Sequence, residues 1–340
     1  MVPAIFGLSG LTLSNEERAF FRDADPAGYI LFGRNIQDRE QLRALTDELR
    51  AIHGRERLFI CIDQEGGRVA RMQPPVWTAY PPGEVFDRLY DIGPISAMEA
   101  ARCNAQALGM DLAEVGITVA LYPSLDLRHS GTHDVIGDRA FGSHPMQVAA
   151  LGRFALDGLA QAGVAGCIKH MPGHGRAQAD SHKELPTVDA SAEELEQDLE
   201  PFRSLATTPI GMTAHVRYTA WDPHNAATLS PFVVQEVIRG SIGFDGLLLT
   251  DDLDMQALQG SVPKLAAQAL GAGCDLALNC WAKMDDMVGI ARTCPDMPEG
   301  TAVRLDRALT LPTEVASAHQ AELAAKRDAL LALVANAAGA

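Results

Sequence analysis

The chain lacks the features that mark secreted and membrane proteins. No stretch of its 340 residues approaches the ~18 consecutive apolar residues that a membrane-spanning helix requires. The N-terminal segment, residues 1–6, has neither the basic stretch nor the apolar core of a signal peptide. The sequence therefore predicts a cytoplasmic protein that does not insert into a membrane.

Positive charge and nucleotide-binding motifs are scarce as well. The 28 Lys and Arg residues are outnumbered by 44 Asp and Glu residues, which gives a formal net charge of −16 at pH 7. Because nucleic acids and anionic membrane surfaces are bound through clustered Lys and Arg, this charge argues against both as partners. Neither a G-x-G-x-x-G fingerprint nor a G-x-x-x-x-G-K-[ST] loop occurs, so no nucleotide cofactor is expected.

Cysteine carries little functional information in this chain. The six cysteines lie far apart and lack the paired spacing of a zinc site, as expected of reduced and mostly buried thiols. Hydrophobic residues make up 47% of the chain and charged residues 21%, which suffices for a large core. No linker, repeat or low-complexity tract divides the sequence, so we expect residues 1–340 to form one domain.

Short apolar runs alternate with helix-patterned segments along the whole chain. The segments between the runs have apolar residues at three- and four-residue spacing, as in Gln37–His53, Ser96–Val115, Ser191–Leu205 and Pro231–Arg239. Strands buried on both faces are continuously apolar, which favours a parallel sheet covered by helices. Eight such units favour a closed (β/α)8 barrel, a TIM-type α/β fold, over an open sheet. The predicted strands are Val2–Phe6, Tyr29–Phe32, Leu58–Ile62, Ile117–Leu121, Val164–Ile168, Ile210–Thr213, Leu247–Thr250 and Asp275–Leu278.

Ionisable residues follow several of the predicted strands. In a parallel barrel these positions converge on one rim, where barrel enzymes carry their catalytic groups. Turns alone would supply Ser, Asn and Gly more often than ionisable residues. Loops at 73–82 and 128–143 are expected to extend this rim, and a helix at 315–337 to pack outside the barrel. The ionisable residues are Asp63, Asp126, Arg128, Lys169, His170, His215, Asp251 and Asp252.

The segment 169–182, KHMPGHGRAQADSH, carries three histidines. Pro172 and two glycines rule out an ordinary helix, so we expect a mobile loop that leaves a strand. Asp180 and His182 are two residues apart, which places both side chains on one face of an extended chain. The carboxylate would raise the basicity of the imidazole, forming an acid/base dyad that transfers protons near neutral pH. A solvated turn and a metal site remain as alternatives, although the spacing matches no standard zinc pattern.

Two more clusters contain carboxylates. Asp251 and Asp252 stand at a predicted strand end, where they could bind a divalent cation or supply a nucleophile. One carboxylate opposite a proton donor is what retaining glycoside hydrolysis requires. Asp63, with Arg71 eight residues later, could hydrogen-bond to vicinal sugar hydroxyls or simply cap a helix.

Together these clusters resemble glycoside hydrolase family 3, in particular its bacterial β-N-acetylhexosaminidase (β-N-acetylglucosaminidase) branch of peptidoglycan recycling. The resemblance covers nearly the whole chain, from GYILFGRN at 28–35 to residue 279. The order and spacing of the motifs make coincidence improbable. They are IDQEGGRVARM at 62–72, GDRAFG at 137–142, KHMPGHG at 169–175, DSH at 180–182, MTAHV at 212–216 and TDDLDM at 250–255.

The resemblance implies a role for each matching position. Asp251 corresponds to the catalytic nucleophile, His182 to the acid/base histidine and Asp180 to its supporting carboxylate. A second group corresponds to residues that hold the N-acetylglucosamine unit, and comprises Asp63, Arg71, Arg139, Lys169 and His170.

The chain departs from the family pattern at three positions. Thr250 and Asp254 stand where serine is usual, and Met171 stands where phenylalanine is common, and none of these changes removes a catalytic group. Two-domain relatives acting on β-glucosides generally take the proton donor from a second domain. A short chain with a histidine in the loop fits the hexosaminidase branch better.

The implied activity is that of a retaining exo-β-N-acetylglucosaminidase acting on cytoplasmic anhydro-muropeptides without metal or organic cofactor. We expect it to act as a monomer or weak oligomer. Three rivals remain from the sequence. The first is a glycoside phosphorylase, since imidazole does not repel an incoming phosphate. The second is a substrate-assisted route through the 2-acetamido group, and the third is a non-catalytic muropeptide sensor.

Overall fold

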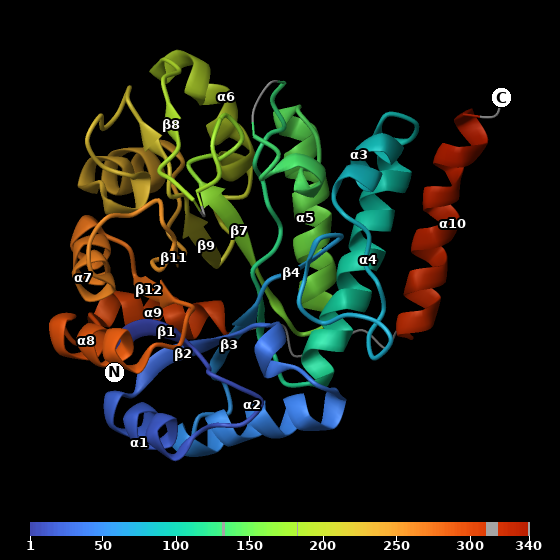
Figure 1. The fold of residues 1–340 in the computed structure, drawn as a ribbon. Helices are drawn as coiled ribbons and strands as arrows, with labels where there is room; N and C mark the ends of the chain where they lie inside the picture. Colours follow the sequence, from blue (N-terminus) through green and yellow to red (C-terminus); the bar gives the residue numbers. More distant parts are fainter. Residues whose placement is uncertain (131–132, 182, 311–318, 339–340) are drawn as a thin grey trace.

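The structure, a computed structural model, describes residues 1–130, 133–181, 183–310 and 319–338. In this part of the chain, eight parallel strands close into a barrel in the order β1-β2-β3-β6-β7-β9-β11-β12 (Figure 1). Each strand overlaps one predicted strand, so the predicted (β/α)8 fold is confirmed. The strands are β1 (Val2–Gly7), β2 (Pro26–Leu31), β3 (Phe59–Ile62), β6 (Val119–Ala120), β7 (Ala165–Met171), β9 (Ile210–Thr213), β11 (Leu247–Asp252) and β12 (Leu276–Asn279).

Helices surround the barrel, as Figure 1 shows. Two predicted helices begin at side-chain caps: Asp38 accepts a hydrogen bond from the Gln41 amide at 2.8 Å, and Ser191 forms a capping box with Glu194. The helices are α1 (Asn15–Ala24), α2 (Arg39–His53), α3 (Glu84–Tyr90), α4 (Pro94–Glu114), α5 (Pro145–Gln161), α6 (Ala192–Ser204), the π-helix η4 (Val233–Ser241), α7 (Val262–Ala272), α8 (Met284–Thr293), α9 (Glu299–Ala308) and α10 (Gln320–Ala338), with 3-10 turns η1 (Gly33–Asn35), η2 (Gly137–Arg139) and η3 (Ala227–Leu229).

The C-terminal helix α10 packs outside the barrel beside α4, at the edge of the molecule in Figure 1. Arg327 of α10 donates a hydrogen bond to the Asn104 side chain of α4 at 3.0 Å. The predicted outer helix is therefore present from residue 320, while residues 315–318 of the predicted range lie outside the described part. No helix of the described residues is long and apolar enough to span a bilayer.

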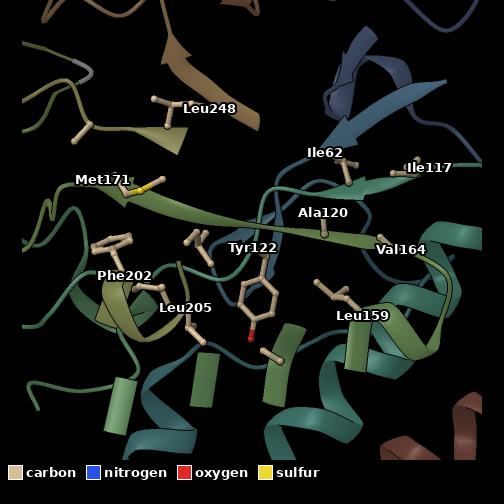
Figure 2. Close-up of a cluster of buried hydrophobic side chains, with 14 of the residues drawn as sticks. Ile62, Ile117, Ala120, Tyr122, Leu159, Val164, Met171, Phe202, Leu205 and Leu248 are labelled. Atoms are coloured by element: carbon tan, nitrogen blue, oxygen red, sulfur yellow. The ribbon is translucent and has the colours of Figure 1, made fainter. Parts of the chain in front are cut away.

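The core has an inner and an outer layer because neighbouring strand residues point to opposite faces. Leu247 and Leu249 of β11 face the barrel interior, whereas Leu248 between them packs toward the helices. Figure 2 shows part of the outer layer, where Ala120 and Leu248 from the strands lie with side chains of α5 and α6. Four inner side chains also form part of a cavity at the end of the barrel: Ile30, Leu121, Met212 and Leu278.

Strand β7 runs further than the predicted Val164–Ile168 and includes Lys169, His170 and Met171. Backbone pairing persists there, since the Leu125 amide donates to the Lys169 carbonyl at 2.7 Å and the Ala214 amide to the Met171 carbonyl at 2.7 Å. Pro172, which has no N–H, follows the last strand residue. Lys169 and His170 therefore lie on a rigid strand end and not in the loop that follows it.

Candidate active site

A cavity of about 590 Å³ opens at the C-terminal ends of the barrel strands. Its walls come from residues at or just after the ends of β2, β3, β7, β11 and β12, as expected for the functional rim of a barrel. Six of the predicted site residues line this cavity, namely Asp63, Arg71, Arg139, Lys169, His170 and Asp251. The structure thus brings together residues from four separate sequence motifs.

Lys169 lies at the centre of a buried ion cluster. Its ammonium group is 2.9 Å from Asp63 Oδ1 and 2.7 Å from Glu65 Oε1, and its side chain is only 2% exposed. Burial lowers the pKa of Lys169, but the two carboxylates outweigh it and raise that pKa to about 12. Lys169 is therefore charged at neutral pH.

Asp63 is held between two cations. Lys169 contacts one carboxylate oxygen, and Arg71 Nη2 lies 3.2 Å from the other. Burial raises the pKa of Asp63, yet the two cations outweigh burial and hold it below its usual value. The cluster therefore presents an acceptor and several donors to the cavity, which suits hydroxyl and amide groups of a sugar.

Glu65 organises the other half of the cluster. It lies on β4 (Gln64–Gly66), which pairs with β5 (Val69–Ala70) in a short hairpin after β3. Its carboxylate accepts two hydrogen bonds from Arg139, from Nε at 2.9 Å and from Nη2 at 2.8 Å. Burial raises the pKa of Glu65, but Arg139 and Lys169 hold it well below its usual range. Sequence reasoning assigned no role to Glu65, and the available signal was its place in the DQEGG stretch.

The glycines of that stretch explain how the hairpin fits. Gly66 has φ of 110°, and a Cβ there would lie 2.2 Å from the Pro81 carbonyl oxygen. A side chain at this position would push the hairpin off the segment that supports it. The glycine pair therefore serves to place Glu65, and no feature of a nucleotide-binding loop is involved.

Asp251 is kept ionised at the end of β11. Its Oδ1 accepts a hydrogen bond from the Asp252 amide at 2.8 Å. Burial raises the pKa of Asp251, but His215, His170, Lys169 and this hydrogen bond outweigh burial and hold it below its usual value. An anionic carboxylate on the cavity wall is chemically able to act as a nucleophile.

Asp252 has a different environment from its neighbour. Its Oδ1 accepts hydrogen bonds from the backbone amides of Asp254 at 3.0 Å and Cys280 at 3.3 Å. Burial, with the nearby carboxylates of Asp254 and Asp251, raises the pKa of Asp252 to about 7. The two adjacent carboxylates thus have pKa values moved in opposite directions, so Asp251 is the more completely ionised of the two at neutral pH.

His170 is oriented by a buried aspartate. Its Nδ1 lies 2.6 Å from Asp126 Oδ2, and Asp126 is fully buried. Asp126 Oδ1 also accepts a hydrogen bond from the His174 amide at 2.6 Å. Burial raises the pKa of Asp126, but His170 and His174 hold it well below its usual range. With Nδ1 engaged, Nε2 is the ring nitrogen of His170 that can meet a ligand.

The loop after β7 is packed rather than solvated over its described part. His174 Nε2 lies 3.2 Å from the Ser181 hydroxyl, and the Ser181 carbonyl accepts a hydrogen bond from the Ala257 amide at 3.2 Å. Burial and the neighbouring His170 lower the pKa of His174 to about 4, so its ring is neutral at pH 7. Ser181, which stands between the two predicted dyad residues in the sequence, is thereby held through its side chain and through its backbone carbonyl.

Asp180 lies beside the main cavity. It lines a smaller cavity of about 280 Å³ together with Arg68, Val69 and Arg139, which also line the main one. His182 lies outside the described residues, so the predicted dyad with Asp180 stays a prediction. Among the described residues, no group of three or more His, Cys, Asp or Glu side chains has the arrangement of a metal site.

Comparisons of the sequence show which known proteins the chain is similar to. The model of the glycosyl hydrolase family 3 N-terminal domain matches residues 5–298. Beta-hexosaminidases of Aromatoleum aromaticum and Alkalilimnicola ehrlichii are 38% and 41% identical over 317 and 310 residues, covering 91% and 90% of this chain and 88% of each relative.

Solved structures are similar over the whole fold. NagZ from Neisseria gonorrhoeae in complex with N-trifluoroacetyl-D-glucosamine superposes with a TM-score of 0.84 at 33% identity, covering 98% of this chain and 97% of that one. A family 3 β-N-acetylglucosaminidase from Paenibacillus sp. superposes with a TM-score of 0.85 at 30% identity, covering 98% and 66%. The barrel, the cavity at its rim and these matches lead to one conclusion: the chain belongs to glycosyl hydrolase family 3 and is a glycoside hydrolase.

Proposed function

We propose that the chain is a retaining exo-β-N-acetylglucosaminidase. The observation that carries this proposal is the ionised Asp251 in the same cavity as the Asp63, Lys169 and Arg139 cluster. A nucleophilic carboxylate beside donors and an acceptor for one sugar unit is the arrangement that retaining hydrolysis needs. The relatives named beta-hexosaminidase, and the similar structure with a bound N-trifluoroacetyl-D-glucosamine, support N-acetylglucosamine as that unit.

In the first step, an oxygen of Asp251 bonds to the anomeric carbon while the bond from that carbon to the leaving oxygen breaks. The leaving oxygen takes a proton from His182, whose ring Asp180 orients. In the second step, water attacks the anomeric carbon, gives its proton to His182 and releases Asp251. The two inversions retain the β configuration.

The first experiment is hydrolysis of p-nitrophenyl N-acetyl-β-glucosaminide by the wild type and by Asp251→Asn. We expect steady release of p-nitrophenol from the wild type and only background release from the variant, because the amide is a poor nucleophile. An inactive wild type would contradict the proposal and favour a sensor. The same reaction run with inorganic phosphate separates hydrolysis from phosphorolysis, since only a phosphorylase forms the sugar 1-phosphate.

The acid/base role of His182 predicts a dependence on the leaving group. His182→Ala should slow cleavage of a GlcNAc disaccharide by about 10²–10⁴-fold, because an alkoxide leaves poorly without a proton. Aryl glycosides with acidic leaving groups should be slowed much less. Measured rates that fall equally for both substrate types would remove His182 from the proton-donor role.

We further propose that the natural substrates are anhydro-muropeptides in the cytoplasm, with the chain acting in peptidoglycan recycling as a monomer or weak oligomer. The motif resemblance supports this. Purified anhydro-muropeptides incubated with the enzyme should lose one N-acetylglucosamine residue in mass spectra. Intact muropeptides beside a cleaved aryl glycoside would contradict the substrate assignment while leaving the activity in place.

We also propose that residues 1–340 unfold as one domain, in a single calorimetric transition.

A further inference from the structure

One exposed aromatic side chain lines the catalytic cavity. Trp281 follows β12 on the rim and is 61% exposed, although it also contributes to the cavity wall. A large apolar side chain left exposed at a binding cavity loses the free energy of burial until a ligand covers it. Other strongly exposed apolar residues, such as Ile95 and Met146, are not part of this cavity.

The cavity has two chemically different surfaces. Asp63, Lys169 and Arg139 form the charged surface described above. Trp281, which is exposed, and Met255, which is buried, are apolar residues of the same cavity lining. An indole ring offers a flat apolar face against which the C–H groups of a pyranose pack, which is a different mode of recognition from hydroxyl binding.

Asp254 holds the backbone that carries Trp281. Its Oδ2 accepts hydrogen bonds from the Cys280 amide at 3.1 Å, the Trp281 amide at 3.2 Å and the Asn279 side chain at 2.7 Å. Serine is usual at position 254 in the family that the sequence resembles. Its hydroxyl is one bond closer to the backbone than the Asp254 carboxylate oxygen and does not reach all three donors. This departure from the pattern therefore has a structural consequence at the rim.

The indole ring is held from one side as well. The ammonium group of Lys283 lies 5.3 Å from its ring centroid, within cation–π range. A fixed backbone and a cation on the ring restrict the orientation of Trp281 without burying it. Such pre-organisation lowers the entropy that a ligand must remove on binding.

We propose that Trp281 forms the subsite for the second sugar ring, on the leaving-group side of the bond to be cleaved. This inference rests on the proposed function, which places the terminal sugar over Asp251 within the charged part of the cavity. A second ring then extends outward to the rim, where Trp281 lies. The ligand class is a β-linked disaccharide of hexosamine units.

The test compares two substrates that share the terminal sugar and differ in the leaving group. One is a β-linked N-acetylglucosamine disaccharide, and the other is N-acetyl-β-glucosaminyl fluoride, whose leaving group is a single atom. For Trp281→Ala we expect kcat/KM to fall about tenfold on the disaccharide, which corresponds to about 1.4 kcal/mol, and less than about threefold on the fluoride. Trp281→Phe should restore part of the loss because it keeps an aromatic face.

Two further variants sharpen the test. Asp254→Ser should show a smaller loss with the same preference for the disaccharide, because it frees the backbone and keeps the indole. Phe232→Ala is the matched control, since Phe232 is 50% exposed and does not line the cavity. It should leave both kcat/KM values at the wild-type level.

The outcomes separate the inference from the function on which it rests. An active wild type, with Trp281→Ala equally impaired on both substrates or impaired on neither, would overturn the subsite. A wild type that cleaves neither substrate would instead overturn the proposed function, and the subsite with it. Circular dichroism of each variant excludes loss of the fold as the cause.

Discussion

Replacing Glu65 by glutamine tests whether the buried ion cluster stabilises the site. Glutamine has nearly the same shape but no charge, and it turns an N–H₂ group toward a cation. Arg139 loses a carboxylate that it contacts at 2.8 and 2.9 Å, and Lys169 loses one of its two carboxylate partners. Asp63 then remains as a carboxylate in contact with Lys169.

The expected cost is large because the charges are buried. Glu65 is 5% exposed, Arg139 10% and Lys169 2%, so solvent screens their interactions little. Removing one partner of a buried ion pair costs about 3–5 kcal/mol, because the other charge stays uncompensated. At roughly 2–4 °C per kcal/mol, the melting temperature should fall by about 6–20 °C. KM should rise too, since Lys169 and Arg139 lose their fixed orientation.

Differential scanning calorimetry at pH 7 measures this effect, with Glu84→Gln as the matched control. Glu84 pairs with Arg88 on the surface, and Arg88 is 61% exposed. Surface pairs of this kind contribute about 0–1 kcal/mol, so the control should melt within a few degrees of the wild type. Equal melting temperatures for the two variants would refute the reasoning that the buried cluster stabilises the fold.

Two more predictions follow from the carboxylates and the loop. Asp252, with a pKa of about 7 in the fold and about 3.9 when unfolded, stabilises the protein fully below pH ~4, and this contribution is lost as pH rises through ~7. Urea unfolding at pH 5 and pH 8 measures the free energy of unfolding. This free energy should differ less between the two pH values in Asp252→Asn than in the wild type, and an equal difference would contradict the assignment. Ser181→Ala removes the contact with His174 and should lower kcat with little change in KM. The loss should stay below the ~10²–10⁴-fold cost of removing a general acid, because proton transfer is impaired and not abolished. A rise in KM without loss of kcat would show that Ser181 acts on binding instead.

The barrel was predictable because buried parallel strands leave a simple trace in the sequence. Leu247–Leu249 and Phe59–Ile62 are continuously apolar, and both are barrel strands. The end of β7 was not predictable in this way. Lys169 is strongly polar, and only its partners Asp63 and Glu65, supplied by other segments, make its burial in a strand possible.

The site residues were found by motif, whereas their partners were found only in the structure. Glu65 and Arg139 are 74 residues apart, and Asp126 and His170 are 44 apart. Local patterns contain no information about which distant charges meet. The sequence predicts a mobile loop after β7, but the described loop residues His174 and Ser181 are buried. The mobility of this loop and the pairing of His182 with Asp180 stay predictions.

The most direct test of the account is to trap the glycosyl-enzyme with a fluorinated N-acetylglucosamine derivative that carries a reactive leaving group. After proteolysis, mass spectrometry locates the sugar on the chain. We predict one label, on the peptide that contains Asp251 and on that side chain. A label on another residue, or turnover through a cyclised 2-acetamido product with no labelled peptide, would contradict the claim that Asp251 is the nucleophile.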